Sequence, residues 1–485
     1  MFSRAVVRYS KQLRGQDLSE FLQTAAGRFD ARFVAQFEDD LRSSWGYATT
    51  CNAVSREAGG EAGIEACRAL AVRVSRLDNT RMKEISPSAL SLFASSFGRD
   101  PSAECQAAII SIAELCCDES FAFDELQNQS QALLVNGFSK WPDEESCGEA
   151  TEAIAREVCG ARLSEYIPQN LANLVNGFSK WPEQAHCSQA AGLLAGEICR
   201  RAARRDGLFD FNQQGLANLV NGFGKWPEDR CGKAIVAIAK EIVARADQLP
   251  DFTSQGLANL VNGFSKWPEE EESRRATAAI GNEVSRRAQN NELRGFVSQD
   301  LANLVNGFSK WSNEAGCRKG TVDIAAELCR YAVLDASLSD FHPQHLANLV
   351  NGFSKWPDEA IPARAAGFVG SVLCRRATRA DGLSDFTAQH LANLVNGFTK
   401  WPEQTGCTEA ALAIADEVVH AEASRLSSFS PQLLANLVSG FSSRPEESCR
   451  RATVKMAGEV LSRADREGQF PAFGSARPGK PGEWF

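Results

Sequence analysis

The chain has 485 residues, a formal net charge of −9 at pH 7 and 44% hydrophobic residues. This hydrophobic content can form packed cores and excludes disorder over most of the chain, while the acidic balance argues against coating nucleic acid through net charge alone. No run of about 18 apolar residues occurs, so we expect no membrane-spanning helix, and we expect no Sec-type signal peptide. The odd count of fifteen cysteines favours reduced thiols and a reducing compartment.

The first part of the chain, residues 1–61, has no internal similarity to the rest and is predicted to form a separate head. Directly after it, residues 65–77 (EACRALAVRVSRL) have the pattern of a long amphipathic helix. At the other end, residues 466–485 are rich in Pro and Gly and are predicted to form a frayed tail.

Between these ends, residues 62–465 are built from a repeated motif, LANLVNGFSKWP and close variants. The motif tryptophans are 40 to 45 residues apart. An eighth copy carries Arg444 in place of Trp, and a degenerate early copy ends at Pro101, which gives about nine repeats. This period is typical of two-helix solenoids; WD40 propellers share it but need alternating strands, which are not visible. The motif tryptophans are Trp141, Trp181, Trp226, Trp267, Trp311, Trp356 and Trp401.

Each repeat is predicted to fold as a short helix followed by a longer one. Leu171, Leu174, Val175 and Phe178 form one apolar helical stripe that Trp181 continues. The short helix is expected to start at an N-cap such as Thr387, or with Pro at its first position, and to end at Trp-Pro. Pro and acidic residues then open the long helix. The predicted fold is an all-α αα-solenoid of the HEAT or armadillo kind.

Two polar residue types recur on the short helix, opposite its apolar stripe. We call them the Asn–Lys ladder, because stacked helices about 8–10 Å apart should align them in rows. Each Asn side chain has a hydrogen-bond donor and an acceptor, so a row of them can bond to a peptide backbone. A row of Lys side chains favours binding of an acidic segment or of phosphates. Alternatively, the Asn side chains bond between repeats, and the Lys side chains cap helix ends and pair with the acids after Trp-Pro. The ladder comprises Asn173, Asn176, Lys180, Asn218, Asn221, Lys225, Asn259, Asn262, Lys266, Asn303, Asn306, Lys310, Asn348, Asn351, Lys355, Asn393, Asn396 and Lys400.

Other repeated residues favour packing over chemistry. The motif Trp is expected in the core, and Gly177 and its equivalents are expected to permit close approach of helices. Cysteines that recur twelve residues apart, such as Cys147 and Cys159, do not converge on one metal, and no CxxC or HxxxH occurs. His345 and His390 occupy corresponding positions, but the other repeats lack that His, so no shared general base follows. We therefore predict no catalytic residue, no metal site and no cofactor.

The tetrapeptide SKWP within LANLVNGFSKWP resembles the SKWP-repeat family of type III secretion effectors of plant-pathogenic bacteria such as Ralstonia and Xanthomonas. The resemblance implies an armadillo/HEAT-like virulence protein without established enzymatic activity, delivered by the type III system into a plant cell. It also implies that residues 1–61 contain a secretion leader, although the first residues are basic and not Ser-rich.

Two functions of different classes remain. The first is a monomeric, non-enzymatic scaffold that binds a host protein or an extended peptide along the Asn–Lys ladder. The second is a helical-repeat protein that binds single-stranded RNA through the Lys row, which would require a salt-sensitive affinity. An enzyme would need its active site within the head, which is too short for one of known type.

Overall fold

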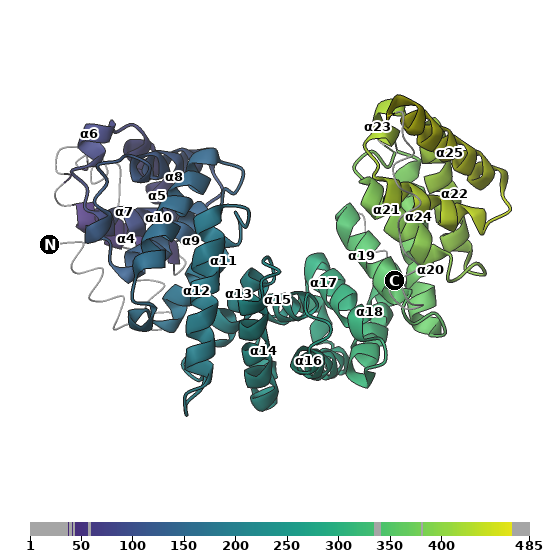
Figure 1. Ribbon diagram of the computed structural model, residues 1–485, viewed down its shortest axis with the longest axis horizontal. Helices are drawn as coiled ribbons and strands as arrows, with labels where there is room; N and C mark the ends of the chain where they lie inside the picture. Colours follow the sequence, from purple (N-terminus) through teal and green to yellow (C-terminus); the bar gives the residue numbers. More distant parts are fainter. Residues whose placement is uncertain are drawn as a thin grey trace. The chain divides into compact units, whose positions relative to one another are not determined.

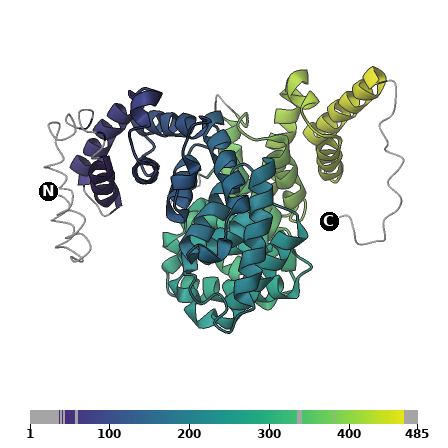
Figure 2. The ribbon, with the colours of Figure 1, turned by 60° about the vertical axis from the view of Figure 1, so that its left-hand side comes forward.

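The computed structural model describes residue 37, residue 41 and the ranges 44–56, 60–333, 341–379 and 382–467. Over these residues the chain consists of helices joined by loops, without a β-strand (Figure 1, Figure 2). The helices belong to two compact units, Met1–Arg245 and Ala246–Phe485. Within the described ranges, no helix is at once long and apolar enough to cross a membrane.

Within each unit the helices alternate between two layers. One layer contains short helices: α7 (Pro87–Phe97), α9 (Asn128–Phe138), α11 (Pro168–Phe178), α13 (Gln213–Phe223), α15 (Ser254–Phe264), α17 (Ser298–Phe308), α19 (Pro343–Phe353), α21 (Ala388–Phe398) and α24 (Pro431–Ser442). The other contains long helices: α8 (Ala103–Cys116), α10 (Glu145–Gly160), α12 (Ala185–Ala202), α14 (Asp229–Ala244), α16 (Glu271–Gln289), α18 (Ala315–Val333), α20 (Ala360–Ala377), α22 (Thr405–His420) and α25 (Glu447–Glu467).

Each short helix packs on the next short helix of its unit, and each long helix on the next long one. The described residues thus contain nine short–long pairs in consecutive order, and the predicted αα-solenoid is confirmed. The remaining helices are α4 (Ser44–Arg56), α5 (Gly60–Ser75), α6 (Asn79–Met82) and α23 (Ala423–Ser427), with short 3₁₀ turns η2 (Phe123–Glu125), η3 (Leu163–Glu165), η4 (Ala246–Asp251), η5 (Glu292–Gly295) and η6 (Ser309–Trp311).

Helix α4 lies inside the stretch predicted as a separate head, yet it packs on α7 while α5 packs on α8. The two-layer packing therefore begins before the first copy of the motif, and α5 contains most of the helix predicted at 65–77 but begins earlier and ends at Ser75. The sequence of α4, SWGYATTCNAVSR, does not contain the motif, so its place in the short-helix layer could not be predicted from the repeat. The secretion leader predicted in the first residues and the Pro/Gly-rich part of the tail lie outside the described residues.

The short helices approach one another closely because most motif glycines pack against the motif valine of the preceding repeat in their unit. A Cβ added to Gly222 would lie 2.7 Å from Cγ1 of Val175 and 3.0 Å from its carbonyl oxygen. At Gly352 the corresponding distances to Val305 are 2.5 and 3.0 Å. The packing role predicted for these glycines is confirmed, and the same Gly–Val contact fixes one register between successive short helices of a unit.

Both ends of the short helix are closed locally. At the start, the side chain of Thr387 accepts the N–H of His390, and Pro168 and Pro343 occupy the first turn as predicted. The end differs from the prediction: α11 stops at Phe178, three residues before Trp181. The hydroxyl of Ser179 donates to the carbonyl of Asn176 at 2.7 Å, and turn-type bonds from the next backbone N–H groups end the helix there.

The start of the long helix also lies later than predicted. Helix α12 begins at Ala185, with Gln184 as N-cap, and α10 begins at Glu145 after Glu144. Residues between Trp-Pro and the helix form a turn, because backbone N–H groups such as that of Gln184 bond back to the carbonyl of Trp181. Glu183 therefore precedes its helix and Glu144 caps it, whereas Glu145 and Asp229 lie in the first turn, as predicted.

In five repeats the motif tryptophan links its repeat to the one before it. The indole Nε1 of Trp181 donates to the carbonyl of Pro142 at 3.1 Å, and Trp311 donates to Pro268 at 2.9 Å. Both indoles are buried, as are Trp226, Trp356 and Trp401, which confirms the predicted core role for these five; Trp141 and Trp267 are half-buried. The same bond is made by Trp226 to Pro182, Trp356 to Ser312 and Trp401 to Pro357.

The loops that lead into several short helices are held by a partly or fully buried arginine, in most cases from the end of the long helix. Arg287 donates to the carbonyls of Leu249, Pro250 and Phe252, and its Nε donates to Glu283 at 2.7 Å. Such buried carbonyls need a partner, and the Glu compensates the buried positive charge. We call this arrangement the Arg clamp. It recurs at Arg201, Arg245, Arg425 and Arg463.

Candidate functional site

Nearly every position of LANLVNGFSKWP has a structural role except the two asparagines and the lysine. Leu171, Leu174, Val175 and Phe178 are wholly buried, the glycine contacts the previous helix, the serine closes the helix end and the tryptophan links repeats. The ladder residues lie on the opposite side of the short helix, where every Asn is half-buried and every Lys is exposed. The structure thus keeps the predicted ladder on one face of the short-helix layer in each unit.

Most ladder asparagines have no hydrogen-bond partner for their side-chain amide within the described part of the chain. In Asn393, by contrast, the amide oxygen accepts from Gln389 at 2.9 Å, and Asn221 and Asn262 also interact with neighbouring groups. The alternative that these side chains bond between repeats therefore does not hold for the majority. The amides without a partner belong to Asn173, Asn176, Asn218, Asn259, Asn303, Asn306, Asn348, Asn351 and Asn396.

The ladder lysines are not required to close the helix ends. In α11 the carbonyls of the last turn are already bonded: Val175 accepts the N–H of Ser179, and Gly177 accepts that of Lys180. The carbonyl of Asn176 accepts the Ser179 hydroxyl. The ammonium group of Lys180 is therefore free to point into solvent.

Among the described residues, no carboxylate lies within ion-pair distance of five of the six ladder lysines or of Lys140, the corresponding lysine of an earlier repeat; Lys266, the remaining ladder lysine, interacts with a neighbouring group. The predicted pairing with acids after Trp-Pro is absent for these six because the long-helix layer holds several of those acids. Glu144 accepts from Gln106 at 2.7 Å and Glu228 from Ser188 at 2.6 Å. The six are Lys140, Lys180, Lys225, Lys310, Lys355 and Lys400.

The lysines also lower one another's pKa. Desolvation lowers the pKa of Lys180, and the positive charges of Lys225 and Lys140 lower it further. In the second unit, desolvation lowers the pKa of Lys355, with added repulsion from Lys310 and Lys400. These effects show that lysines of successive repeats are neighbours, as the ladder requires.

Three histidines gather where α19 and α21 begin. The ring of His342 lies 5.7 Å from that of His345 and 6.5 Å from that of His390, measured between centroids. The Nδ1 of His345 is 3.0 Å from the Ser298 hydroxyl. Desolvation lowers the pKa of His345 and of His390, and the neighbouring His342 lowers both further. The sequence analysis placed His345 and His390 at corresponding positions of two repeats but did not predict that they lie close to His342.

The cysteines behave as small apolar residues where they are buried. All fifteen are free thiols, and burial raises the pKa of Cys147 and of Cys231 to about 12. Cys159 and Cys199 are only partly buried, because their positions near the helix end turn toward solvent. In the described ranges, no three metal-ligating side chains come close enough to hold an ion.

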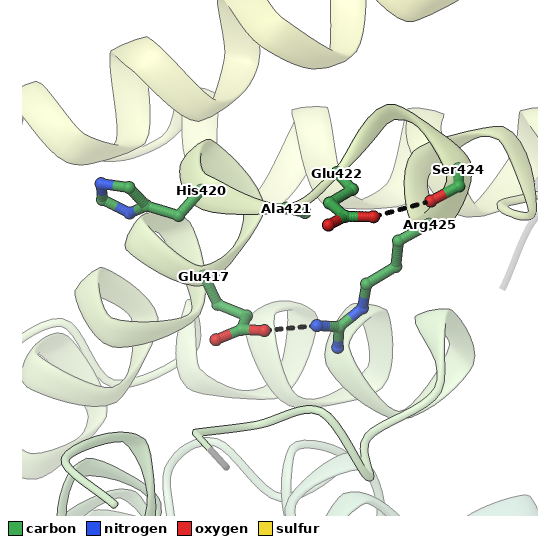
Figure 3. Close-up of a pocket in the computed structure, with 6 residues that line it drawn as sticks. All are labelled: Glu417, His420, Ala421, Glu422, Ser424 and Arg425. Carbon is green, nitrogen blue, oxygen red and sulfur yellow. Dashed lines mark hydrogen bonds and ion pairs between the residues drawn. The ribbon is translucent and has the colours of Figure 1, made fainter. Parts of the chain in front are cut away.

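A polar pocket opens between α22 and α23 (Figure 3). It is lined by Glu417, His420, Ala421, Glu422, Ser424 and Arg425. Glu417 and Arg425 form an ion pair across it, and Arg425 also donates to the carbonyl of Leu383 at 3.0 Å. The pocket is therefore part of an Arg clamp whose arginine comes from α23 instead of the long helix, and its charged groups already have partners.

The Arg clamps are the feature that sequence reasoning missed. Their signal was present as Glu and Arg four residues apart near the end of the long helix, for example Glu197 with Arg201 and Glu241 with Arg245. The spacing escaped notice because the long helices differ much more between repeats than the motif does. The clamps hold the framework, so they add no residue to the ladder.

Comparison with known proteins adds little to this picture. No protein-family model matches the chain, and no curated protein matches it in sequence. Among solved structures, the crystal structure of SYS-1 aligns over 94% of this chain and 98% of its own, with 10% identity and a TM-score of 0.25. A complex of SYS-1 with POP-1 aligns over 96% and 86%, with 10% identity and a TM-score of 0.18. Likenesses this weak carry no argument, and the solenoid assignment rests on the helix packing of this chain.

Proposed function

We propose that the chain is a non-enzymatic helical-repeat scaffold that binds an extended segment of a partner protein along the Asn–Lys ladder. The observation that carries the proposal is the set of half-buried Asn amides without a partner inside the protein. A polar group held at a partly desolvated position gains most from a partner supplied by a ligand.

A peptide backbone suits this ladder chemically. An Asn side chain offers both a donor and an acceptor, which is what a peptide N–H and C=O require, and it does so without selecting side chains. Successive short helices of a unit keep one register through the Gly–Val contact. Equivalent amides are therefore presented at regular intervals, which favours an extended ligand over a compact one.

A library of random unstructured peptides displayed on phage tests the proposal. The full chain is compared with a ladder variant that combines Asn303→Ala, Asn306→Ala, Asn348→Ala and Asn351→Ala. Ala is the better helix former, so the variant should melt at or slightly above the wild-type temperature. Peptides selected on the wild type are expected to lose binding to the variant.

The matched control combines Asn290→Ala with Asn313→Ala, at exposed positions away from the ladder. This control should bind the selected peptides as the wild type does. If the ladder variant unfolds, the Asn side chains are needed for the stability of the protein and not for binding. Equal binding by the wild type and a folded ladder variant would place the binding surface elsewhere.

The cellular role proposed here rests on the resemblance of LANLVNGFSKWP to SKWP-repeat effectors. We propose delivery by a type III system and action inside a plant cell as a virulence effector. A reporter fused to the chain, with and without its first ~60 residues, measures delivery into plant cells. Loss of delivery on deletion is expected, and unchanged delivery would argue against an N-terminal secretion signal.

A further inference from the structure

The charge on the short-helix layer differs from the charge of the whole chain. The chain carries a net charge of −9, yet Asp300 of α17 is the only acidic residue within the described short helices. Asp300 is buried among packed groups, and burial raises its pKa. The exposed charges of this layer within the motif are therefore those of the ladder lysines, and the acids belong to the long helices and to the loops.

For five of the six ladder lysines, all except Lys266, the described elements beside them supply no compensating charge. Glu314 and Glu359, which follow the motif in their repeats, are bound by Arg274 and Arg318 of the preceding long helices. Lysines outside the ladder do have such partners: Lys83 pairs with Asp118 at 3.1 Å and Lys233 with Asp229 at 2.6 Å. Five of the six ladder lysines thus form a row of cations for which the described residues supply no counter-charge.

We propose that the segment bound along the ladder is acidic and extended, with about one carboxylate facing each lysine. This inference rests on the proposed function, since it assigns a chemistry to the ligand of the same surface. The asparagines would hold the backbone of this segment, and the lysines would select its side chains.

The spacing of the repeats favours carboxylates three residues apart. Packed helices lie about 8–10 Å from one another, and the Gly–Val contact keeps the short helices close. A chain in the polyproline II conformation rises about 3.1 Å per residue with three residues per turn, so every third side chain recurs on one side after roughly 9 Å. Such a chain can place successive carboxylates against successive lysines.

Single-stranded nucleic acid fits this surface less well than an acidic peptide. Proteins that bind single strands stack bases on exposed aromatic rings in addition to neutralising phosphates. Here the motif Phe and five of the seven motif Trp side chains are buried: Trp356 is 6% exposed and donates its Nε1 to Ser312, and Phe353 is wholly buried. The ladder offers cations and amides only.

Labelled synthetic peptides of about twelve residues test the inference by fluorescence anisotropy with the full chain. One peptide has Glu at every third position, a second has the same composition with its Glu residues in one block, and a third has Lys in place of Glu. A uridine oligonucleotide of similar length and charge is the fourth probe. We expect the first peptide to bind most tightly.

The protein variants separate the ladder from net charge. Lys310→Gln, Lys355→Gln and Lys400→Gln together should weaken binding of the first peptide roughly tenfold. The control carries Lys83→Gln, Lys233→Gln and Lys319→Gln, which remove equal charge from the first unit and the long-helix layer, and it should bind as the wild type does. Equal losses in both variants would overturn the inference, as would equal binding of the regular and the block peptide. Tighter binding of the oligonucleotide, lost in the ladder variant, would overturn it in favour of nucleic acid.

The phage selection distinguishes this inference from the function on which it rests. Selected peptides that depend on the ladder asparagines and are rich in Asp and Glu would support both. Selected peptides that depend on those asparagines but carry no acidic bias would overturn the inference alone. Selected peptides insensitive to the asparagine variant would overturn the proposed function.

Discussion

The indole Nε1 of Trp401 lies 2.9 Å from the carbonyl oxygen of Pro357, the residue that directly follows the tryptophan of the preceding repeat. The same relationship joins Trp356 to Ser312, although Ser312 replaces the usual proline. The bond therefore uses the backbone and not the proline ring. It explains why tryptophan, the aromatic residue with an N–H donor, recurs at this position.

Replacing this tryptophan should destabilise the preceding repeat, which loses a hydrogen-bond donor, as well as the repeat that contains the tryptophan. Trp356→Phe leaves the Ser312 carbonyl without its donor and reduces a buried ring, so we expect a loss of about 1–3 kcal/mol in the free energy of unfolding. Chemical denaturation measures it. Trp45→Phe is the control, since Trp45 is 53% exposed, and should change stability little. Similar losses for the two variants would contradict the role of the bond.

Because the short helices are in close contact, we expect two Gly→Ala substitutions to change the stability of the protein in opposite directions. Gly352→Ala would force a methyl group against Val305, including its backbone oxygen, and should cost about 1–3 kcal/mol. Gly196→Ala, in the middle of α12 with no atom near its added Cβ, should stabilise by about 0.5–1 kcal/mol. Thermal melts of both variants check this. A stabilising Gly352→Ala would contradict the packing described here.

The Arg clamp predicts a large effect from one charged residue. Arg287→Met removes the donor of the carbonyls of Leu249, Pro250 and Phe252 and leaves Glu283 paired with Arg286 alone. Breaking a buried pair costs roughly 3–5 kcal/mol, so we expect a loss of about 3 kcal/mol. The exposed pair of Lys233 and Asp229 is the control: Lys233→Met should change stability by less than about 1 kcal/mol. An Arg287→Met variant as stable as this control would refute the clamp.

The same clamp predicts a loss of stability in acid. Burial acts to raise the pKa of Glu283, but hydrogen bonds from Arg286 and Arg287 outweigh it and hold the pKa below the ordinary value of 4.5. A carboxyl whose pKa is depressed in the folded state stabilises it above the unfolded pKa, and this contribution is lost as the pH falls through the folded pKa. Below pH 5, the free energy of unfolding should therefore decrease less steeply with falling pH for Glu283→Gln than for the wild type. Chemical denaturation at a series of pH values measures it. Parallel curves would contradict this.

The period, the helix types and the roles of Trp and Gly could be predicted because each leaves a repeated residue at a fixed position. Helix ends were misplaced by about three residues, since Trp-Pro looks like a stop but the Ser179 hydroxyl closes α11 at Phe178. The Arg clamp at Arg287 and the packing of α4 on α7 were missed because both are set by contacts in space and not by a copied motif.

For the candidate site, the sequence predicted which residues share a face but not what they contact. Asn173 could have bonded to the next repeat, and Lys180 could have paired with Glu183 or capped α11. Neither outcome follows from spacing, because each depends on which competing donor or acceptor is nearer. In the structure, the Ser179 hydroxyl and the backbone N–H groups occupy the helix-end carbonyls first, which leaves the ladder side chains for other partners.

The direction of the tryptophan bonds has a consequence for shortened chains. Within a unit, every donor indole belongs to the later repeat and every acceptor carbonyl to the earlier one. During synthesis a new repeat therefore meets an acceptor that is already made. Removing the later repeat exposes a carbonyl that can bond to water. Removing the earlier repeat leaves a buried indole N–H without its acceptor. Truncation from the C-terminal side of a unit should be tolerated better than truncation from the N-terminal side.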